Sequence, residues 1–210
     1  MSSFTYEYTD KQNIYETYEW DNVWIEQAND NKTNRVLYVG DSISCATRTI
    51  ATAYTNGKIL FDGFGTSKGI DNPYFKDSLA LFSAQLPKID SVIFNNGLHG
   101  WHLDDEKEYS FHYEEMIKFL LKKYKGVPLF VVLTSFIADE ERLKRVKIRN
   151  TYAVKFAKKY NLPVIDVYSV TEKNKDLLSS DGVHFTLEGY QVIAKAVVEK
   201  IAEILPEYKY

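Results

Sequence analysis

The chain has 210 residues, of which 45% are apolar, 26% charged and 15% aromatic, and its net charge is −3 at pH 7. This length supports one sizeable core and is too short for two full domains. The near-neutral charge excludes a general attraction to nucleic acid or to an anionic membrane surface.

The first residues, MSSFTYEYTD, contain neither the basic nor the apolar part of a secretory signal. No apolar run approaches the roughly 20 residues of a membrane span. The single cysteine, Cys45, excludes an intramolecular disulfide. We therefore expect a cytoplasmic protein that binds neither a membrane nor nucleic acid.

Residues 1–34 are polar and aromatic and end in a loop-like stretch at 29–34. They are too few for a domain, so they are expected to form an N-terminal extension that packs on a body at residues 35–210. Trp20 and Trp24 are four residues apart and would share one face if this stretch were helical.

From residue 35 onward, short β-branched or aromatic runs alternate with longer segments of helical periodicity. In chain order the sequence predicts strand 35–39, helix 44–54, strand 58–61, helix 76–86, strand 91–94, helix 109–125, strand 128–134, helix 140–159, strand 163–167 and helix 187–204. This alternation predicts an α/β fold with a parallel sheet and helices on both of its faces. Ligands bind such sheets at the carboxyl ends of the strands, so the loops that follow the strands are the candidate site.

The loop after the first predicted strand contains Gly40, Asp41 and Ser42. Glycine permits a sharp turn, and Ser42 then stands at the start of a helix, where free N–H groups favour developing negative charge. A serine hydroxyl there becomes a nucleophile if a base lies near it. The alternative is that Asp41 or Ser42 only caps the helix.

The loop before the last predicted helix contains Asp181 and His184, three residues apart around Gly182. At this spacing the carboxylate can orient the imidazole, while the other ring nitrogen takes a proton from a serine. The alternative is a turn aspartate and a structural histidine. Because both loops belong to the same edge of the predicted sheet, we expect Ser42, Asp181 and His184 to form a catalytic triad.

These two loops resemble the sequence blocks of the SGNH hydrolases, the GDSL-like lipases and acylhydrolases. Gly40-Asp41-Ser42-Ile43 is similar to their GDS(L) block, and the stretch from Asp181 to His184 is similar to their terminal DxxH block. The resemblance spans residues 35 to about 204. It implies a flavodoxin-like, three-layer α/β/α sandwich that hydrolyses esters or thioesters without a metal or other cofactor.

The resemblance also implies an oxyanion hole, for which the matching blocks are weaker. The family places an Asn after the third strand, and here Asn95 is the first choice and Asn96 the alternative, although the glycine that usually precedes it is missing. A glycine N–H is expected from Gly65, with Gly69 as the alternative. The Ser42 N–H would be the third donor.

Two further residues of the third loop, His99 and Trp101, are expected to line the substrate pocket, with Trp101 as a platform for a sugar or an acyl group. His99 and His102 could also suggest a metal site, but no third ligand follows at a characteristic spacing, so no metal is expected.

The resemblance implies a serine esterase that acts on short-chain, chiefly acetyl, esters of a carbohydrate or another small alcohol through an acyl-enzyme intermediate. Three alternatives stay open. An acyltransferase would use the same site, a lipid-acting esterase would prefer long acyl chains, and a non-catalytic carbohydrate-binding protein would bind without turnover.

Overall fold

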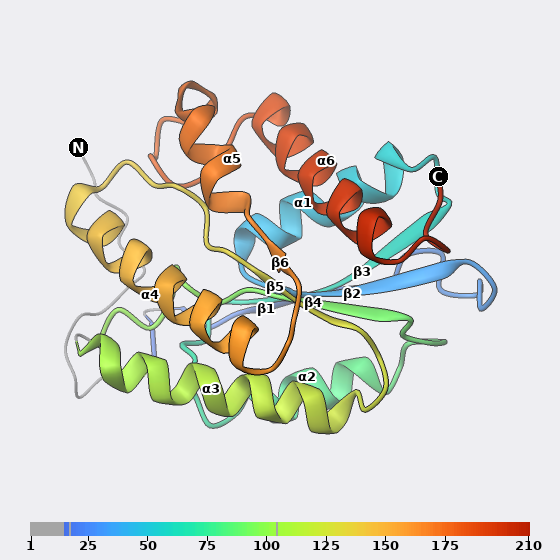
Figure 1. Ribbon diagram of the computed structural model, residues 1–210, viewed down its shortest axis with the longest axis horizontal. Helices are drawn as coiled ribbons and strands as arrows, with labels where there is room; N and C mark the ends of the chain where they lie inside the picture. Colours follow the sequence, from blue (N-terminus) through green and yellow to red (C-terminus); the bar gives the residue numbers. More distant parts are fainter. Residues whose placement is uncertain (1–14, 17, 104) are drawn as a thin grey trace.

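The computed structural model describes residues 15–16, 18–103 and 105–210, and these form one six-stranded sheet covered by helices (Figure 1). The strands lie in the order β1-β3-β2-β4-β5-β6. Their bounds are β1 Asp21–Trp24, β2 Asn34–Gly40, β3 Ile59–Thr66, β4 Ser91–Phe94, β5 Leu129–Val132 and β6 Val164–Ile165. Strands β2 to β6 pair in parallel, whereas β1 pairs antiparallel with β3.

The helices form the two outer layers of a sandwich. One face carries α1 (Ser42–Tyr54), α5 (Val167–Lys173) and α6 (Leu187–Ile204), and the other carries α2 (Phe75–Ser83), α3 (Glu106–Lys123) and α4 (Glu140–Lys159) (Figure 1). A 3₁₀ turn, η1 (Lys175–Leu177), follows α5. The predicted three-layer α/β/α sandwich is therefore confirmed.

Alternation along each strand divides the apolar side chains between two cores. In β2, Val36 and Tyr38 pack toward α1 and α6, whereas Leu37 and Val39 pack toward α2 and α3. Successive side chains of a strand point to opposite faces, so a strand buried on both faces must be apolar throughout. Complete burial of one such side chain stabilises the fold by about 1.5–3 kcal/mol.

The five predicted strands and five predicted helices are all present, but some bounds differ. Strand β3 continues to Thr66 although the sequence predicts its end at residue 61, because Gly63 and Gly65 weaken the strand pattern. The stretch with Trp20 and Trp24 is not helical but forms the edge strand β1. All four residues of β1 are exposed, so the sequence lacks the alternation of apolar and polar residues that would predict this strand.

A buried ion pair ties the described part of the N-terminal segment to the sheet. The Arg35 guanidinium binds the Asp62 carboxylate at 2.8 and 2.9 Å, and both side chains are at most 1% exposed. Arg35 also donates to the carbonyl of Asp30 at 2.7 Å, and the Glu26 N–H donates to Asp62 at 2.9 Å. Residues 1–14 of the expected extension lie outside the described residues.

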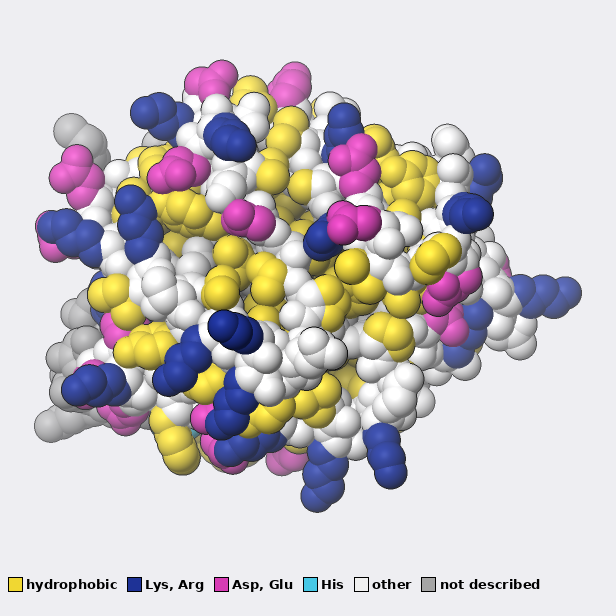
Figure 2. Space-filling view, in the orientation of Figure 1, with side chains coloured by type: hydrophobic (Ala, Val, Ile, Leu, Met, Phe, Trp, Pro, Cys, Tyr) yellow, Lys and Arg dark blue, Asp and Glu magenta, His cyan; other side chains and the backbone are white. Residues whose placement is uncertain are grey.

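On the face shown in Figure 2, acidic and basic side chains stand among apolar ones. In the part of the chain that the structure describes, no helix is both long enough and apolar enough to cross a membrane.

Candidate active site

The turn between β2 and α1 brings Ser42 to the carboxyl edge of the sheet. A side chain on Gly40 would meet Cβ of Ser44 at 2.7 Å, so glycine is required for the helix to begin at once. Asp41 is the N-cap, and its carboxylate accepts the N–H of Ile43 at 2.9 Å. Ser42 is thus the first residue of α1, with its side chain beside the positive end of the helix dipole.

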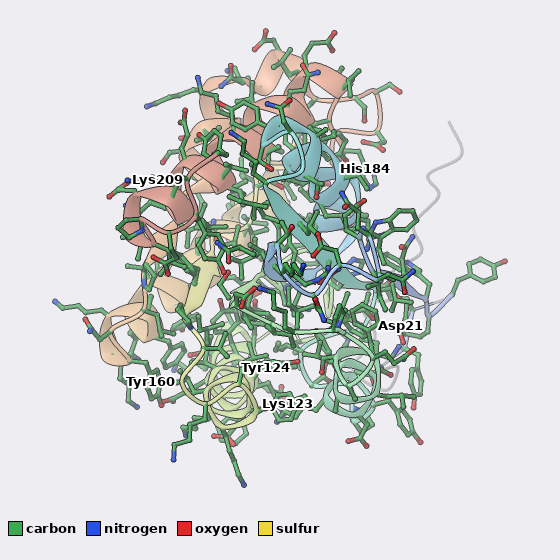
Figure 3. All side chains as sticks on the ribbon, turned by 90° about the vertical axis from the view of Figure 1, so that its right-hand side faces the viewer. Asp21, Lys123, Tyr124, Tyr160, His184 and Lys209 are labelled. Atoms are coloured by element: carbon green, nitrogen blue, oxygen red, sulfur yellow. The ribbon has the colours of Figure 1, made fainter. Side chains whose placement is uncertain are left out.

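Ser42 contacts the histidine that the sequence predicted. Nε2 of His184 lies 2.8 Å from Oγ of Ser42, and Nδ1 of the same ring lies 2.7 Å from Oδ2 of Asp181. This chain of hydrogen bonds lets the imidazole take the hydroxyl proton while the carboxylate stabilises the resulting imidazolium. Figure 3 shows His184 on the same side of the molecule as Asp21, away from Tyr160 and Lys209.

The surroundings of Asp181 keep its carboxyl ionised. Partial burial would raise the pKa of Asp181, but hydrogen bonds from the Val183 and His184 backbone N–H groups, the His184 ring and the Ser179 hydroxyl outweigh it. The net effect holds the pKa below its usual range. The carboxylate can therefore serve as a fixed negative partner for the imidazole.

The turn that carries Asp181 and His184 is itself anchored. Gly182 has a φ of +74°, in the left-handed region that favours glycine. Its carbonyl accepts the Ala138 N–H at 2.8 Å, which joins this turn to the loop after β5. The Ser179 N–H donates to the His184 carbonyl at 2.8 Å, closing the turn.

Asn95, the first choice for the oxyanion hole, has its amide hydrogens committed elsewhere. Its Nδ2 donates to the Val132 carbonyl at 2.9 Å and to Oγ1 of Thr134 at 3.1 Å, so neither hydrogen is left for a substrate. Among the described residues, Nδ2 of Asn96 donates to the Lys68 carbonyl alone, at 3.2 Å. The alternative residue therefore has an N–H to offer and the first choice does not.

Gly65 lies inside β3 rather than in the loop where the sequence predicts it. A Cβ there would stand 2.1 Å from Sγ of Cys45 and 3.1 Å from the Asp41 carbonyl, so α1 packs directly on this glycine. The alternative, Gly69, does lie in the loop after β3, where a Cβ would meet Cα of Gly100 at 3.0 Å. Gly65 thus has a packing reason that is independent of any chemistry.

Trp101 does not offer a platform to substrate, contrary to the prediction. The residue is 2% exposed, and its ring lies under the guanidinium of Arg149, 4.5 Å from the ring centroid. His99 is also buried, with Nδ1 2.6 Å from Oε1 of Glu16, and its ring meets the edge of the Trp20 ring. His102 pairs with a different carboxylate, Asp71, at 2.8 Å.

The N-terminal segment borders the site, which the sequence did not indicate. The Trp20 N–H donates to Oγ of Ser67 at 2.9 Å, and the Ser67 N–H donates to the Trp20 carbonyl at 3.1 Å. Lys68 binds Asp21 at 2.8 Å. These contacts join two segments far apart in sequence, and no local pattern in either segment predicts them.

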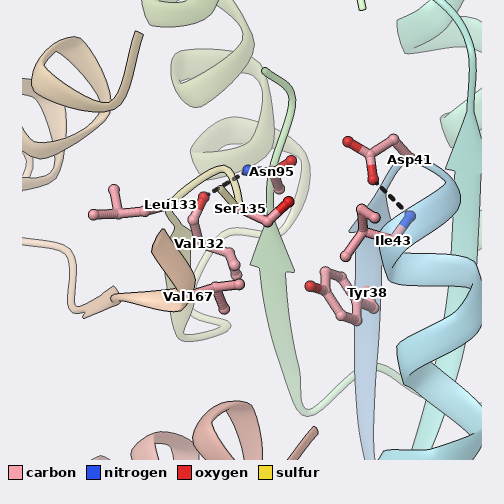
Figure 4. A pocket seen from close by; sticks show the side chains of 8 residues that line it. All are labelled: Tyr38, Asp41, Ile43, Asn95, Val132, Leu133, Ser135 and Val167. Atoms are coloured by element: carbon pink, nitrogen blue, oxygen red, sulfur yellow. Dashed lines mark hydrogen bonds between the residues drawn. The ribbon is translucent and has the colours of Figure 1, made fainter. Parts of the chain in front are cut away.

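A small cavity adjoins the first turn of α1, between the ends of β2, β4 and β5 (Figure 4). Its lining consists of Tyr38, Asp41, Ile43, Asn95, Val132, Leu133, Ser135 and Val167. Oδ2 of Asp41 and Oγ of Ser135 are buried there without a hydrogen-bond partner among the described residues. Burial raises the pKa of Tyr38, and the Asp41 carboxylate adds to this rise. The cavity therefore combines apolar walls with unsatisfied polar atoms beneath the first turn of α1.

Sequence and structure comparisons connect this geometry to known proteins. Residues 139–197 match the family model described as GDSL-like lipase/acylhydrolase. No curated protein matches the chain in sequence.

Three solved structures illustrate the similarity in fold. An acetyl xylan esterase is 19% identical in sequence to this chain. The match covers 80% of this chain and 99% of the esterase chain, with a TM-score of 0.64. A GDSL-like lipase from Bacteroides thetaiotaomicron is 17% identical, and the match covers 85% of this chain and 92% of the lipase chain, with a TM-score of 0.65. The catalytic domain of the Streptococcus pneumoniae peptidoglycan O-acetyltransferase A is 16% identical, and the match covers 81% of this chain and 94% of that domain, with a TM-score of 0.63.

Proposed function

We propose that this protein is a serine esterase of the SGNH superfamily of GDSL-like hydrolases, and that it acts on short-chain, chiefly acetyl, esters of a carbohydrate or another small alcohol. The observation that carries the proposal is the continuous hydrogen-bond chain from Ser42 through His184 to Asp181, with contacts of 2.8 and 2.7 Å. These two hydrogen bonds can activate the Ser42 hydroxyl as a nucleophile without a cofactor.

The proposed reaction has two acyl-transfer steps. His184 removes the proton of Ser42 as the hydroxyl attacks the ester carbonyl, and then protonates the departing alcohol. Water, activated by the same imidazole, attacks the acyl-serine and releases the acid and the free Ser42 hydroxyl. Asp181 stays ionised and keeps the ring in the tautomer that both steps need.

The oxyanion is proposed to rest on the N–H of Ser42 and the side chain of Asn96. The first N–H groups of a helix have no intrahelical partner, so the Ser42 N–H can serve a substrate. Asn96 replaces Asn95 in this role, because the Asn95 amide hydrogens are used by Val132 and Thr134. A glycine N–H from Gly65 or Gly69 is the proposed third donor.

The preference for a short acyl group is supported by the names of similar solved structures. The similar structures include acetyl xylan esterases and a peptidoglycan O-acetyltransferase, which act on acetyl groups according to their names. The transferase among them keeps open a second candidate function, in which a sugar hydroxyl rather than water receives the acyl group on the same Ser42.

The test compares wild type and Ser42→Ala on p-nitrophenyl acetate, butyrate and octanoate. We expect wild type to prefer the short esters and the variant to lose at least about a thousandfold in kcat/KM. Equal activity of the two proteins would refute Ser42 as the nucleophile, and ligand binding without turnover would support a carbohydrate-binding protein. An added acceptor sugar that is acetylated faster than the ester is hydrolysed would favour the transferase.

A further inference from the structure

The loop between β4 and α3 begins beside the proposed nucleophile. The Asn95 N–H donates to the Val39 carbonyl at 3.0 Å, which places Asn95 next to Gly40, two residues before Ser42. Asn96, the proposed oxyanion donor, follows at once. The conformation of this loop therefore decides where one wall of the site stands relative to Ser42.

A buried arginine on α4 holds this loop by its carbonyl groups. Arg149 is 1% exposed, and its Nη1 donates to the carbonyls of Gly97 at 3.1 Å and His99 at 2.7 Å. Its Nη2 donates to the Gly100 carbonyl at 3.0 Å. Three donors of one rigid group thus fix three peptide units within four residues.

Two neighbours extend the same arrangement. Arg145, one turn earlier on α4, donates to the Trp101 carbonyl at 3.0 Å and also to the Leu103 carbonyl. Glu106, at the start of α3, accepts from Nε of Arg149 at 2.9 Å and from Nε of Arg145. We call Arg145, Arg149 and Glu106 the arginine clamp.

Aromatic rings complete the contacts of Arg149. Its guanidinium carbon lies 4.5 Å from the centroid of the Trp101 ring and 4.1 Å from that of Tyr109. The Tyr109 hydroxyl donates to the Asn96 carbonyl. The carbonyls held from α3 and α4 are therefore those of Asn96, Gly97, His99, Gly100, Trp101 and Leu103.

Apolar packing alone could hold a loop in place at a lower cost than a buried cation. Removing a guanidinium from water is expensive, even with a carboxylate partner. The clamp, unlike apolar packing, fixes the direction in which each peptide group of the loop points. A trans peptide points its N–H opposite to its carbonyl, so the N–H groups that follow the held carbonyls face away from α4.

We propose that Arg149, assisted by Arg145 and Glu106, is a positioning residue that fixes the peptide directions and the Asn96 side chain in the wall beside Ser42. This inference rests on the proposed esterase function. Arg149 touches no reacting atom; its effect on the reaction passes through the loop. The clamp therefore acts on stabilisation of the transition state rather than on proton transfer by His184.

The variant Arg149→Lys keeps the charge but cannot reach three carbonyls at once. With p-nitrophenyl acetate we expect kcat to fall by about 10- to 100-fold, with KM changed by less than about threefold. The pH at which the rate is half-maximal should stay that of wild type, because the imidazole and its partners are untouched. Hydrogen exchange should rise in residues 96–103 and stay unchanged in α6.

Arg145→Lys provides a second variant if Arg149→Lys folds poorly, because the Arg145 side chain is 22% exposed and its loss is easier to tolerate. We expect the same direction with a smaller loss of kcat, and faster exchange near Trp101 and Leu103. Leu120→Ala serves as the matched control. Leu120 is buried in α3, and the hydrogen bonds to these carbonyls come from Tyr109, Arg145 and Arg149 instead, so its truncation should lower the unfolding midpoint while leaving kcat per folded molecule unchanged.

Several results would overturn the proposal. One is a wild-type kcat and wild-type loop exchange in Arg149→Lys. Another is a loss of kcat that merely follows the unfolded fraction, as in Leu120→Ala. Failure of the esterase function is separately visible, because Ser42→Ala would then behave as wild type while loop exchange still reports whether the clamp holds the loop.

Discussion

Ser42 differs from the neighbouring serines in the partner of its hydroxyl. Oγ of Ser44 donates to the Asp41 carbonyl at 2.7 Å, and Oγ of Ser67 contacts Glu19 at 3.3 Å. Neither partner is an imidazole, the side chain whose ordinary pKa lies nearest to neutral pH. The hydrogen-bond partners that distinguish Ser42 thus come from more than a hundred positions away, at His184 and Asp181.

The two adjacent asparagines of the β4–α3 loop provide a matched test at the residue scale. Asn96→Ala should lower kcat by about 100-fold or more, since it removes a proposed oxyanion donor, and should change stability little. Asn95→Ala should mainly lower the free energy of unfolding, because the buried Val132 carbonyl loses its donor. Ester turnover and urea unfolding of both variants check this, and the reverse pattern would restore Asn95 as the oxyanion donor.

Asp181 links the triad to stability as a function of pH. Its pKa lies below the usual range despite the opposing effect of partial burial, because four hydrogen bonds favour the ionised form. A carboxyl with a depressed native pKa stabilises the fold above its unfolded-state pKa of about 3.9, and this contribution disappears as pH falls through the lower native value.

Wild type should therefore be more stable than Asp181→Asn at pH 7, with the difference shrinking as the pH is lowered from about 4 toward 2. The side chain is 52% exposed, so solvent screening keeps the difference small. Urea midpoints of both proteins over this range check the sign. A difference that widened on acidification would contradict the depressed pKa.

At the scale of elements, the local sequence pattern predicts the bounds of two long helices that bury one face against the sheet. The predicted helices 140–159 and 187–204 coincide with α4 and α6, because each has caps and an apolar stripe that the sequence displays. Strand β1 and helix α5 were missed. Strand β1 is exposed along its whole length, and α5 has only seven residues, too few to show a helical period.

The site divides in the same way. Ser42, Asp181 and His184 occupy short motifs next to strand ends, so topology alone predicts that they meet. Their hydrogen bonds give that expectation a concrete geometry. The choice between Asn95 and Asn96 depended on which carbonyls lie near each amide, and the burial of Trp101 depended on Arg149 from another helix. Such tertiary contacts have no counterpart in a local pattern.

The glycines of β3 show that close packing between elements can produce a glycine-rich stretch that resembles an oxyanion-hole motif. Side chains at Gly63 and Gly65 would collide with Arg48 and Cys45 of α1 at 2.3 and 2.1 Å. The glycine-rich stretch is therefore explained by the close approach of α1 to the sheet.

For the molecule as a whole, the beginning of the described chain and the loop before α6 both contribute to the surroundings of the candidate site. Glu16 contacts His99, and Asp21 binds Lys68, while the triad histidine comes from residue 184. The N-terminal segment is fixed at its other end by the buried pair of Arg35 and Asp62. One segment thus connects this buried pair with the wall of the site.

Breaking this pair should cost the whole fold more than breaking a similar pair at the surface. Asp62→Asn leaves the Arg35 guanidinium buried without a counter-charge, and we expect the free energy of unfolding to fall by about 3–5 kcal/mol. Glu115→Gln is the control, since Glu115 pairs with Lys118 at 2.8 Å and is 40% exposed, and it should cost less than about 1 kcal/mol. Urea unfolding measures both. Equal losses would show that the carbonyls of Glu26 and Asp30 suffice for Arg35, and the N-terminal segment would then owe its position to the pairing of β1 with β3 instead.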